Sequence, residues 1–163
     1  MAEGNVRPLQ CGEEVEQASI LEYAGYPADE AASLDTLQAR HTAESRLFIG
    51  YFENEKLLGF VCATSTDADR LTEESMHTHI PHGETICIHS VCVDQGVQRQ
   101  GIATKLLKEF VHKVKGSFPE AKRICLLCHE YLIPLYTKAG FVLVGLSEVV
   151  HGKEPWYDCV MEL

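Results

Sequence analysis

The sequence predicts an α/β fold in which helices flank a mixed β-sheet. Apolar strand-like runs and amphipathic helical stretches alternate in the order β-α-α-β-β-β-α-β-α-β-β. A strongly amphipathic helical stretch separates the apolar runs 85–93 and 123–128, and such a crossover joins parallel strands. The 163 residues are 45% apolar and 23% charged, which suffices for one sizeable core. No repeat, low-complexity tract or linker interrupts the chain, so we expect a single domain over residues 1–163.

The N-terminal part is predicted to hold one strand and two helices. Residues 6–11 form a short strand, and Pro8 places it at a sheet edge because proline cannot donate to a central ladder. Residues 13–23 and 33–43 form the helices. Ser33 suits the N-cap of the second helix, since its hydroxyl can accept a hydrogen bond from the first turn.

An antiparallel hairpin and a long polar loop follow. Two apolar runs, 47–53 and 56–64, flank a turn at Asn54-Glu55. Residues 67–84 are polar, rich in His and long for a connection. Such loops are often functional, and we expect this one to be mobile.

The strand 85–93 and the helix after it carry the clearest patterns. In the helix, apolar side chains form two rows of one stripe: Ile102, Leu106, Phe110 and Val114, and Ala103, Leu107 and Val111. In the strand, bulky aliphatic residues fall at Ile86 and Ile88 and then at Val91 and Val93, so the inward parity switches. A β-bulge has this effect because one extra residue flips the alternation, although neighbouring cysteines can also blur it.

The C-terminal part predicts three strands and a short helix. Strands are expected at 123–128, 141–149 and 157–162. The helix begins near Pro134 and ends at Lys138-Ala139-Gly140, where glycine can adopt the left-handed cap conformation.

The charge balance and the lack of targeting signals exclude several classes of protein. Fourteen Lys and Arg against 24 Asp and Glu give a net charge of −10. This is the wrong sign for nucleic-acid binding and favours cationic partners. No apolar run approaches the roughly 20 residues that span a bilayer, and the N-terminus lacks the pattern of a signal peptide. We therefore expect a cytoplasmic protein that binds neither nucleic acid nor membranes.

The cysteine and histidine residues call for a check of two other chemistries, thiol chemistry and metal binding. Without an export signal, most of the seven cysteines are expected to be small buried hydrophobic side chains rather than a disulfide framework. Cys125 and Cys128 have CxxC spacing, but in a strand residues i and i+3 point to opposite faces, which suits neither a zinc pair nor a redox motif. Potential zinc ligands gather around the polar loop: His77, His79, His82, Cys87 and His89. They form no recognised zinc framework, so we expect no metal.

The stretch Gln98-x-x-Gly101-x-Ala103 lies between the apolar strand and the amphipathic helix. Small residues there allow backbone N–H groups at the helix N-terminus to approach an anion, and the helix dipole adds attraction, so a pyrophosphate fits. Arg99 can add a charge-assisted contact. Alone, the pattern is equally typical of a tight turn before a core helix. In this position it resembles the acetyl-CoA-binding motif of the GNAT superfamily of N-acetyltransferases, whose fold the element order also resembles.

A closer resemblance covers nearly the whole chain and is to the arylalkylamine (serotonin) N-acetyltransferase family, in its shorter non-vertebrate form. Three stretches carry it: 69–76 (DRLTEESM), 89–94 (HSVCVD) and 133–141 (IPLYTKAGF). The resemblance implies transfer of acetyl from acetyl-CoA, the expected cosubstrate, to a small-molecule amine such as serotonin, tryptamine or phenethylamine.

The resemblance also assigns roles to individual residues. The family uses two His residues, separated by one position, in proton removal; the second matches His89, whereas Cys87 stands at the first. The family's tyrosine near the thioester sulfur matches Tyr136, and its substrate-binding positions match Val91 and Leu127. Cofactor contacts carry over to two runs: Val91, Cys92 and Val93, and Arg99, Gln100, Gly101, Ile102, Ala103 and Thr104.

These residue types suit the implied chemistry. A primary amine with a pKa near 10 is almost wholly protonated at pH 7, and removing its proton costs roughly 4 kcal/mol. A His can accept that proton directly or through a water, and a phenol can protonate the departing thiolate. Backbone N–H groups at the bulge can polarise the acetyl carbonyl. Taken without the resemblance, His89 and Tyr136 are also compatible with packing roles.

Other functions stay open at the level of sequence. The chain can act as a GNAT on polyamines, diamines or protein amines, which its acidic surface also suits, or as a non-catalytic acetyl-CoA-binding or His-based metal-binding module. Tyr26, Phe60 and Trp156 are candidate walls of an acceptor pocket. Vertebrate members of the family carry phosphorylatable extensions that recruit 14-3-3 proteins. Here five residues precede the first predicted strand and the chain ends at Leu163, so no 14-3-3 partner is expected.

Overall fold

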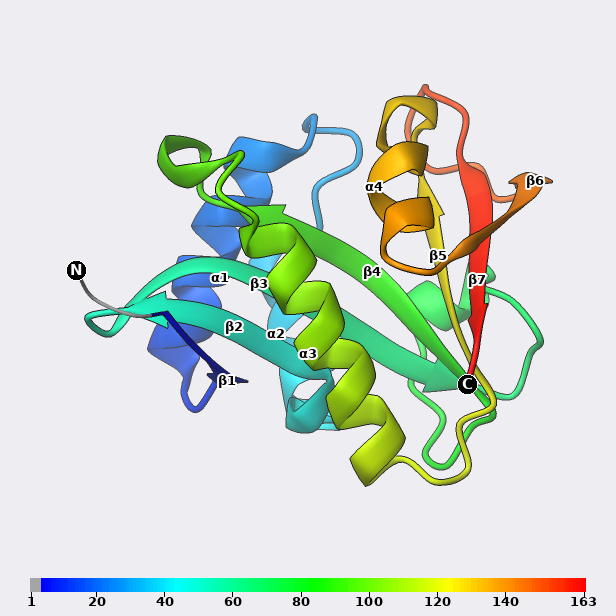
Figure 1. Cartoon of the computed structure of the whole chain (residues 1–163), viewed down its shortest axis with the longest axis horizontal. Coiled ribbons are helices and arrows are strands. Elements are labelled where there is room, and N and C mark those ends of the chain that lie inside the picture. Colours follow the sequence, from blue (N-terminus) through cyan, green and yellow to red (C-terminus); the bar gives the residue numbers. More distant parts are fainter. Residues whose placement is uncertain (1–3) are drawn as a thin grey trace. The chain divides into compact units, whose positions relative to one another are not determined.

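A computed structural model describes residues 4–163 and confirms the predicted α/β fold (Figure 1). Residues 1–3, part of the stretch analysed for a signal peptide, lie outside the described residues. The strands are β1 (Asn5–Pro8), β2 (Phe48–Glu53), β3 (Lys56–Thr66), β4 (Thr85–Val93), β5 (Arg123–Cys128), β6 (Val142–Leu146) and β7 (Tyr157–Glu162). The helices are α1 (Gly12–Gly25), α2 (Leu34–Ala43), α3 (Ile102–Ser117) and α4 (Ile133–Lys138).

The sheet is mixed, as the crossover predicts. Its strand order is β1-β2-β3-β4-β5-β7-β6. β4 and β5, which α3 connects, are parallel, whereas β1 with β2, β2 with β3, and β7 with both β5 and β6 are antiparallel. Between residues 4 and 163, no helix combines the length and apolarity that crossing a membrane requires.

The chain divides into two compact units that are interleaved in sequence. The first unit comprises the chain up to Cys62 together with Ser90–Val111, and the second comprises Ala63–His89 and His112–Leu163. β3, β4 and α3 each contribute residues to both units. Because each unit takes two separate segments, no single cut point divides the chain into them, and the expectation of one domain stays a prediction.

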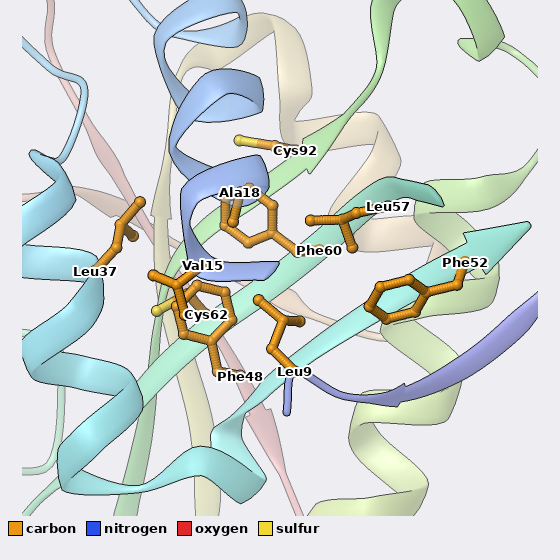
Figure 2. Packing of buried hydrophobic residues seen from close by; sticks show 10 residues of the cluster. All are labelled: Leu9, Val15, Ala18, Leu37, Phe48, Phe52, Leu57, Phe60, Cys62 and Cys92. Carbon is orange, nitrogen blue, oxygen red and sulfur yellow. The ribbon is translucent and has the colours of Figure 1, made fainter. Parts of the chain in front are cut away.

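The core of the first unit lies between two helices and the strands they cover. α1 and α2 lie side by side (Figure 1), and Figure 2 shows Phe48 and Phe60 inside the buried cluster, with ring centroids 5.5 Å apart. α3 packs closely on β3. A Cβ atom added to Gly59 of β3 would lie only 3.1 Å from the side chain of Leu106 on α3. The predicted apolar stripe of α3 is buried at its main positions: Ile102, Leu106, Leu107, Phe110 and Val114.

The second unit is built around β5, which pairs with β4 on one side and with β7 on the other (Figure 1). The loop that precedes β4 is fastened to the end of β3. Ile80 N donates to Ser65 O at 2.9 Å, His79 Nδ1 accepts from Ser65 N at 3.0 Å, and Leu71 is buried. These contacts favour a fixed loop over the mobile one expected from its composition.

Several local predictions are confirmed by backbone geometry. The Ser33 hydroxyl accepts from Thr36 N at 3.1 Å and caps α2. Asn54 and Glu55 both have positive φ, 50° and 65°, which is the conformation of a tight hairpin turn. Gly140 has φ 105° just past α4, in the left-handed conformation that glycine adopts without strain.

Three strands end two or more residues away from their predicted ends. β1 ends at Pro8, since Leu9 leaves the strand to enter the core and α1 already begins at Gly12. β3 continues to Thr66, two residues beyond its expected end. β6 stops at Leu146, and its register with β7 shifts between Leu143 and Gly145.

Candidate functional site

The N-terminus of α3 presents exposed backbone in the first unit. The first bond of the helix runs from Lys105 N to Gly101 O at 3.0 Å, so the three N–H groups before Lys105 precede the intrahelical ladder. Arg99 and Gly101 both have positive φ, 66° and 80°, and turn the chain into the helix. A Cβ built on Gly101 meets no atom within 4 Å. It would extend into open space beside the free N–H groups, so the residues fit a pyrophosphate.

We call this surface at the start of α3, residues 99–104, the cradle. The turn that precedes it is also held in place. The Asp94 carboxylate accepts from Gly96 N at 2.8 Å, and Asp94 N donates to Leu58 O of β3 at 2.7 Å. Arg99, Gln100 and Thr104 are exposed, Ala103 is half-buried and Ile102 is buried. All the predicted cofactor residues from 99 to 104 except the buried Ile102 therefore reach the surface at the start of α3.

The end of β4 contacts α1 and the residue after it. Val91 and Val93 are half-buried, and Cys92 is buried in the core of Figure 2. Val91 N donates to the Tyr26 hydroxyl at 3.4 Å. The first unit thus brings Tyr26, a candidate wall residue, to the backbone of the predicted cofactor strand.

A buried carboxyl group supports this contact. Glu22 is 1% exposed, and its carboxylate accepts from Ala32 N at 2.9 Å and lies 3.7 Å from Cys92 Sγ. Burial raises the pKa of Glu22 and, together with the nearby carboxylate, raises the pKa of Cys92. Glu22 therefore ties the α1–α2 connection to β4.

His89 lies in the second unit, in a hydrogen-bonded chain. Its Nε2 is 2.8 Å from Thr64 Oγ1, and Thr64 Oγ1 donates to Ser75 O at 3.1 Å. The Thr64 hydroxyl has one proton and a carbonyl only accepts, so Thr64 must accept the second bond from His89 Nε2–H. This network assigns the neutral tautomer, and the lone pair of the neutral ring then lies on Nδ1.

The carbonyl of Ser75 is itself fixed by a local turn. Thr72 N donates to Ser75 Oγ at 2.9 Å, Ser75 N donates to Thr72 Oγ1 at 3.1 Å, and Ser75 Oγ donates to Thr72 O at 2.6 Å. Sequence analysis missed both Thr64 and Ser75. The signals available were the Thr72-x-x-Ser75 pattern and a buried hydroxyl in an otherwise apolar strand, neither of which identifies its partner.

Cys87 does not supply a second base beside His89. It is fully buried and packs with Leu71 and Cys125. Burial raises its pKa to about 12, so the thiol stays protonated at neutral pH. Of the two positions that match the family's His pair, only His89 therefore carries a basic side chain.

Leu127 and Tyr136 lie elsewhere in the second unit. The β4–β5 ladder ends at Ile88↔Leu126, one residue before His89 and Leu127, and Leu127 packs against the Cys87 cluster. Tyr136 is 5% exposed on α4, with its ring edge-on to Phe141 at 6.0 Å. The bulge expected between residues 88 and 91 lies past the end of this ladder and stays a prediction.

The remaining aromatic candidates have structural roles. Phe60 lies in the core of the first unit and is fully buried, so the expectation that it lines a pocket is wrong. Trp156 stacks on His129 with ring centroids 4.0 Å apart and donates from Nε1 to His151 O at 2.6 Å.

The cysteine and histidine patterns also resolve into structural contacts. Cys125 packs with Cys87 on one face of β5, whereas Cys128 Sγ lies 3.9 Å from Cys159 Sγ on the other, which confirms that the CxxC pair is split. Six of the seven free cysteines are buried. Within residues 4–163, no three or more His, Cys, Asp or Glu side chains are grouped to hold a metal ion.

Comparisons with known proteins agree with this geometry. Residues 13–141 match the model of the acetyltransferase (GNAT) family. The serotonin N-acetyltransferase of Mesocricetus auratus is 35% identical over 119 residues, which are 73% of this chain and 57% of that protein. The chain spans less than two thirds of the length of the serotonin N-acetyltransferases it matches.

Solved structures share the fold at low sequence identity. The loading GNATL domain of CurA from Lyngbya majuscula has a TM-score of 0.86 at 11% identity over 98% of both chains. The GphF GNAT-like decarboxylase in complex with isobutyryl-CoA has a TM-score of 0.82 at 16% identity, over 97% of this chain and 98% of that one. The family match covers most of the chain and includes the cradle at α3, and the chain therefore belongs to the acetyltransferase (GNAT) family.

Proposed function

We propose that this chain transfers the acetyl group of acetyl-CoA to the primary amine of an arylalkylamine such as serotonin, tryptamine or phenethylamine. The observation that carries the proposal is the fixed tautomer of His89, whose Nε2–H donates to Thr64 and whose lone pair lies on Nδ1. The identity with serotonin N-acetyltransferases supports the acceptor class. The cradle of Arg99 and Gly101 supports a cosubstrate that carries a pyrophosphate.

In the proposed reaction, His89 Nδ1, which is buried, removes one proton from the acceptor ammonium through a water. Deprotonation of a typical amine costs roughly 4 kcal/mol at pH 7, and a positioned base lowers the barrier by accepting the proton as the nitrogen becomes the nucleophile. The neutral nitrogen attacks the acetyl carbon, the new C–N bond forms and the C–S bond breaks. No covalent enzyme intermediate is required.

Tyr136 is proposed to protonate the departing thiolate and to regain its proton from the attacking nitrogen, which must lose a second proton as the amide forms. A phenol is a stronger acid than an alcohol and a suitable donor to a thiolate sulfur. Val91 and Leu127 are proposed to contact the acceptor, and Val91 to Val93 the cosubstrate, as the family resemblance implies.

A thiol-release assay tests the proposed function directly. The protein is incubated with acetyl-CoA and tryptamine, phenethylamine, spermidine or a Lys-containing peptide, and free CoA is measured over time. We expect kcat/KM to be highest for the arylalkylamines. Faster turnover of spermidine would favour the polyamine alternative, and no amine-dependent release would contradict acetyl transfer altogether.

A pH profile of the His89→Gln variant tests the proposed base. Glutamine cannot accept the amine proton, so kcat/KM should fall about 100-fold at pH 7. The deficit should shrink toward pH 9.5, where more of the amine is already neutral. A deficit of constant size from pH 6.5 to pH 9.5 would show that His89 acts in another way.

A further inference from the structure

A cavity of about 250 Å³ opens in the second unit. Asp69 and Arg70 of the loop before β4 form one side, and Cys125 of β5 with Asp158 and Val160 of β7 form the other. Nothing in the proposed reaction uses this cavity or Asp158.

Strand register places the cavity on the same sheet face as His89. Cys87, Cys125 and Val160 form a cross-strand row, because Cys87 pairs with Cys125 and Cys125 pairs with Val160, and all three share one buried cluster. Two residues further along β5, Leu127 pairs with Asp158. Since alternate residues of a strand share a face, Leu127 and Asp158 form the next row on this face. His89 lies two residues after Cys87 on β4 and therefore lies on the same face.

The spacing of this row suits an acceptor of moderate length. β7 lies two strand separations from β4, or about 10 Å at the usual spacing. An arylalkylamine that presents its nitrogen near His89 and lies across Leu127 therefore directs its far end toward Asp158.

Asp158 differs from the other charged residues of the cavity. Its side chain accepts a hydrogen bond from Ser147, and the residue is only 8% exposed. The cavity lining also includes two arginines. Among the described residues, Arg70 forms an ion pair with Asp69 at 3.5 Å, and Arg123 forms one with Glu162 at 3.9 Å. Arg123 also donates to Thr85 Oγ1 at 2.8 Å.

Burying the carboxyl group of Asp158 costs folding free energy, so its burial does not by itself stabilise the fold. Desolvation raises its pKa, although Arg70 and Ser147 act in the opposite direction. A carboxyl group has about four acceptor positions, and a donor that enters the cavity can use those that Ser147 does not fill. A buried carboxyl group that lines a cavity is therefore suited to recognise a hydrogen-bond donor.

We infer that this cavity receives the end of the acceptor amine remote from the reacting nitrogen, and that Asp158 accepts a hydrogen bond from a donor group there. The donor chemistry is an O–H or N⁺–H at the far end, such as the phenolic hydroxyl of serotonin or the second ammonium of a diamine. The inference rests on the proposed function, since it assigns a specificity-determining residue to that reaction.

Matched pairs of amines test the inference on the wild-type protein. We compare kcat/KM for serotonin with tryptamine, and for 1,5-diaminopentane with pentylamine, so that each pair differs in the distal donor. We expect the amine with the donor to be favoured by about tenfold in at least one pair, because a site with a carboxyl acceptor discriminates against a ligand that leaves it without its donor. The pair that shows the preference identifies the donor as hydroxyl or ammonium.

Variants then assign the preference to Asp158. Asp158→Ala should reduce the preference to less than twofold, mainly through a higher KM for the amine that carries the distal donor. Asp158→Asn retains an acceptor oxygen without the charge, so it should keep more preference for a hydroxyl than for an ammonium. Asp67→Asn, which removes an exposed carboxylate of the same loop outside the cavity lining, is the matched control and should keep the wild-type preference.

The outcomes separate the inference from the function beneath it. Equal use of both members of each pair by the wild type would overturn the inference and leave acetyl transfer intact. The same holds if Asp158→Ala folds, as judged by its thermal unfolding, and keeps the full preference, or if Asp158→Asn keeps the full preference for an ammonium. If Asp158→Ala does not fold, the wild-type pairs and Asp158→Asn decide the result. Absence of turnover with every amine would overturn both proposals.

Discussion

In the proposed reaction, Thr64 determines which nitrogen of His89 can act as the base, although Thr64 has no chemical role of its own. Thr64→Val keeps the shape of the side chain but removes the hydroxyl, which leaves Nε2 of His89 and the buried Ser75 carbonyl without this bond. We expect kcat to fall about tenfold while the KM for acetyl-CoA stays unchanged, because only the orientation and tautomer of His89 are disturbed.

Thr64→Ser retains the hydroxyl and is the matched control, which should recover most of the lost kcat. Steady-state kinetics on folded protein measure both variants. Full activity of Thr64→Val would mean that His89 needs no positioning by this hydroxyl.

The same residues show what single-residue analysis can predict. His89 was predicted to be the base because its sequence neighbours resemble a family motif, and this role stays a prediction. Thr64 and Ser75 were not, because their contacts join residues 11 and 25 positions apart and depend on how the loop folds back. Phe60 illustrates the opposite error, since an aromatic residue in a core strand has the same local pattern as one that lines a pocket.

At the scale of elements, the turn into α3 depends on Gly101. Its φ of 80° is unfavourable for a branched residue, and the open space beside it would be filled by a side chain. Gly101→Val should weaken acetyl-CoA binding by at least tenfold in calorimetry, while costing about 1–2 kcal/mol of stability through backbone strain. Gly116→Ala, at a position on the same helix where a Cβ also meets nothing, should bind normally. Unchanged affinity of a folded Gly101→Val would remove the cradle from the proposed function.

β1 is attached to α1 by one carboxylate. Arg7 donates to both oxygens of Glu14 at 2.9 and 2.7 Å, Gln10 N donates to it at 2.8 Å, and the Arg7 guanidinium lies 3.8 Å over the Phe52 ring. The hydrogen bonds from Arg7, followed by the one from Gln10, lower the pKa of Glu14. The stabilisation is therefore complete above the ordinary pKa of 4.5 and is lost as the pH falls through the lowered value.

Glu14→Gln should accordingly reduce the free energy of unfolding by about 1–2 kcal/mol at pH 7. The difference from wild type should narrow as the pH is lowered below 4.5, since the wild-type carboxylate is then also neutralised. Urea unfolding at pH 7 and pH 3 measures this, with the exposed Glu13→Gln as control. A difference of the same size at both pH values would show that the ionic contact is not its source.

Most elements were predictable because their signals are local. The α3 stripe, the Ser33 cap and the Asn54-Glu55 turn each depend on residues within a few positions of one another, and the structure confirms them. The end of β1 was not predictable, because Leu9 leaves the strand to fill a core formed by α1, α2 and β2. The attachment of the loop at 67–84 was not predictable for the same reason, since its composition is polar but Leu71 and His79 contact distant strands; its mobility stays a prediction.

At the scale of the whole molecule, the net charge of −10 acts on every approaching ligand. A cationic amine is attracted and thereby concentrated near the surface, and dissolved salt screens this attraction over about 8–10 Å at physiological ionic strength. We expect the KM for a protonated arylalkylamine to rise about two- to fivefold between 10 and 300 mM NaCl at pH 7. The neutral N-acetylated product lacks the charge, so its inhibition constant should stay flat over the same range. Sucrose at matched osmolality should leave both constants unchanged. An amine KM that does not respond to salt would show that the acidic surface serves solubility alone and that recognition of the amine is confined to short-range contacts.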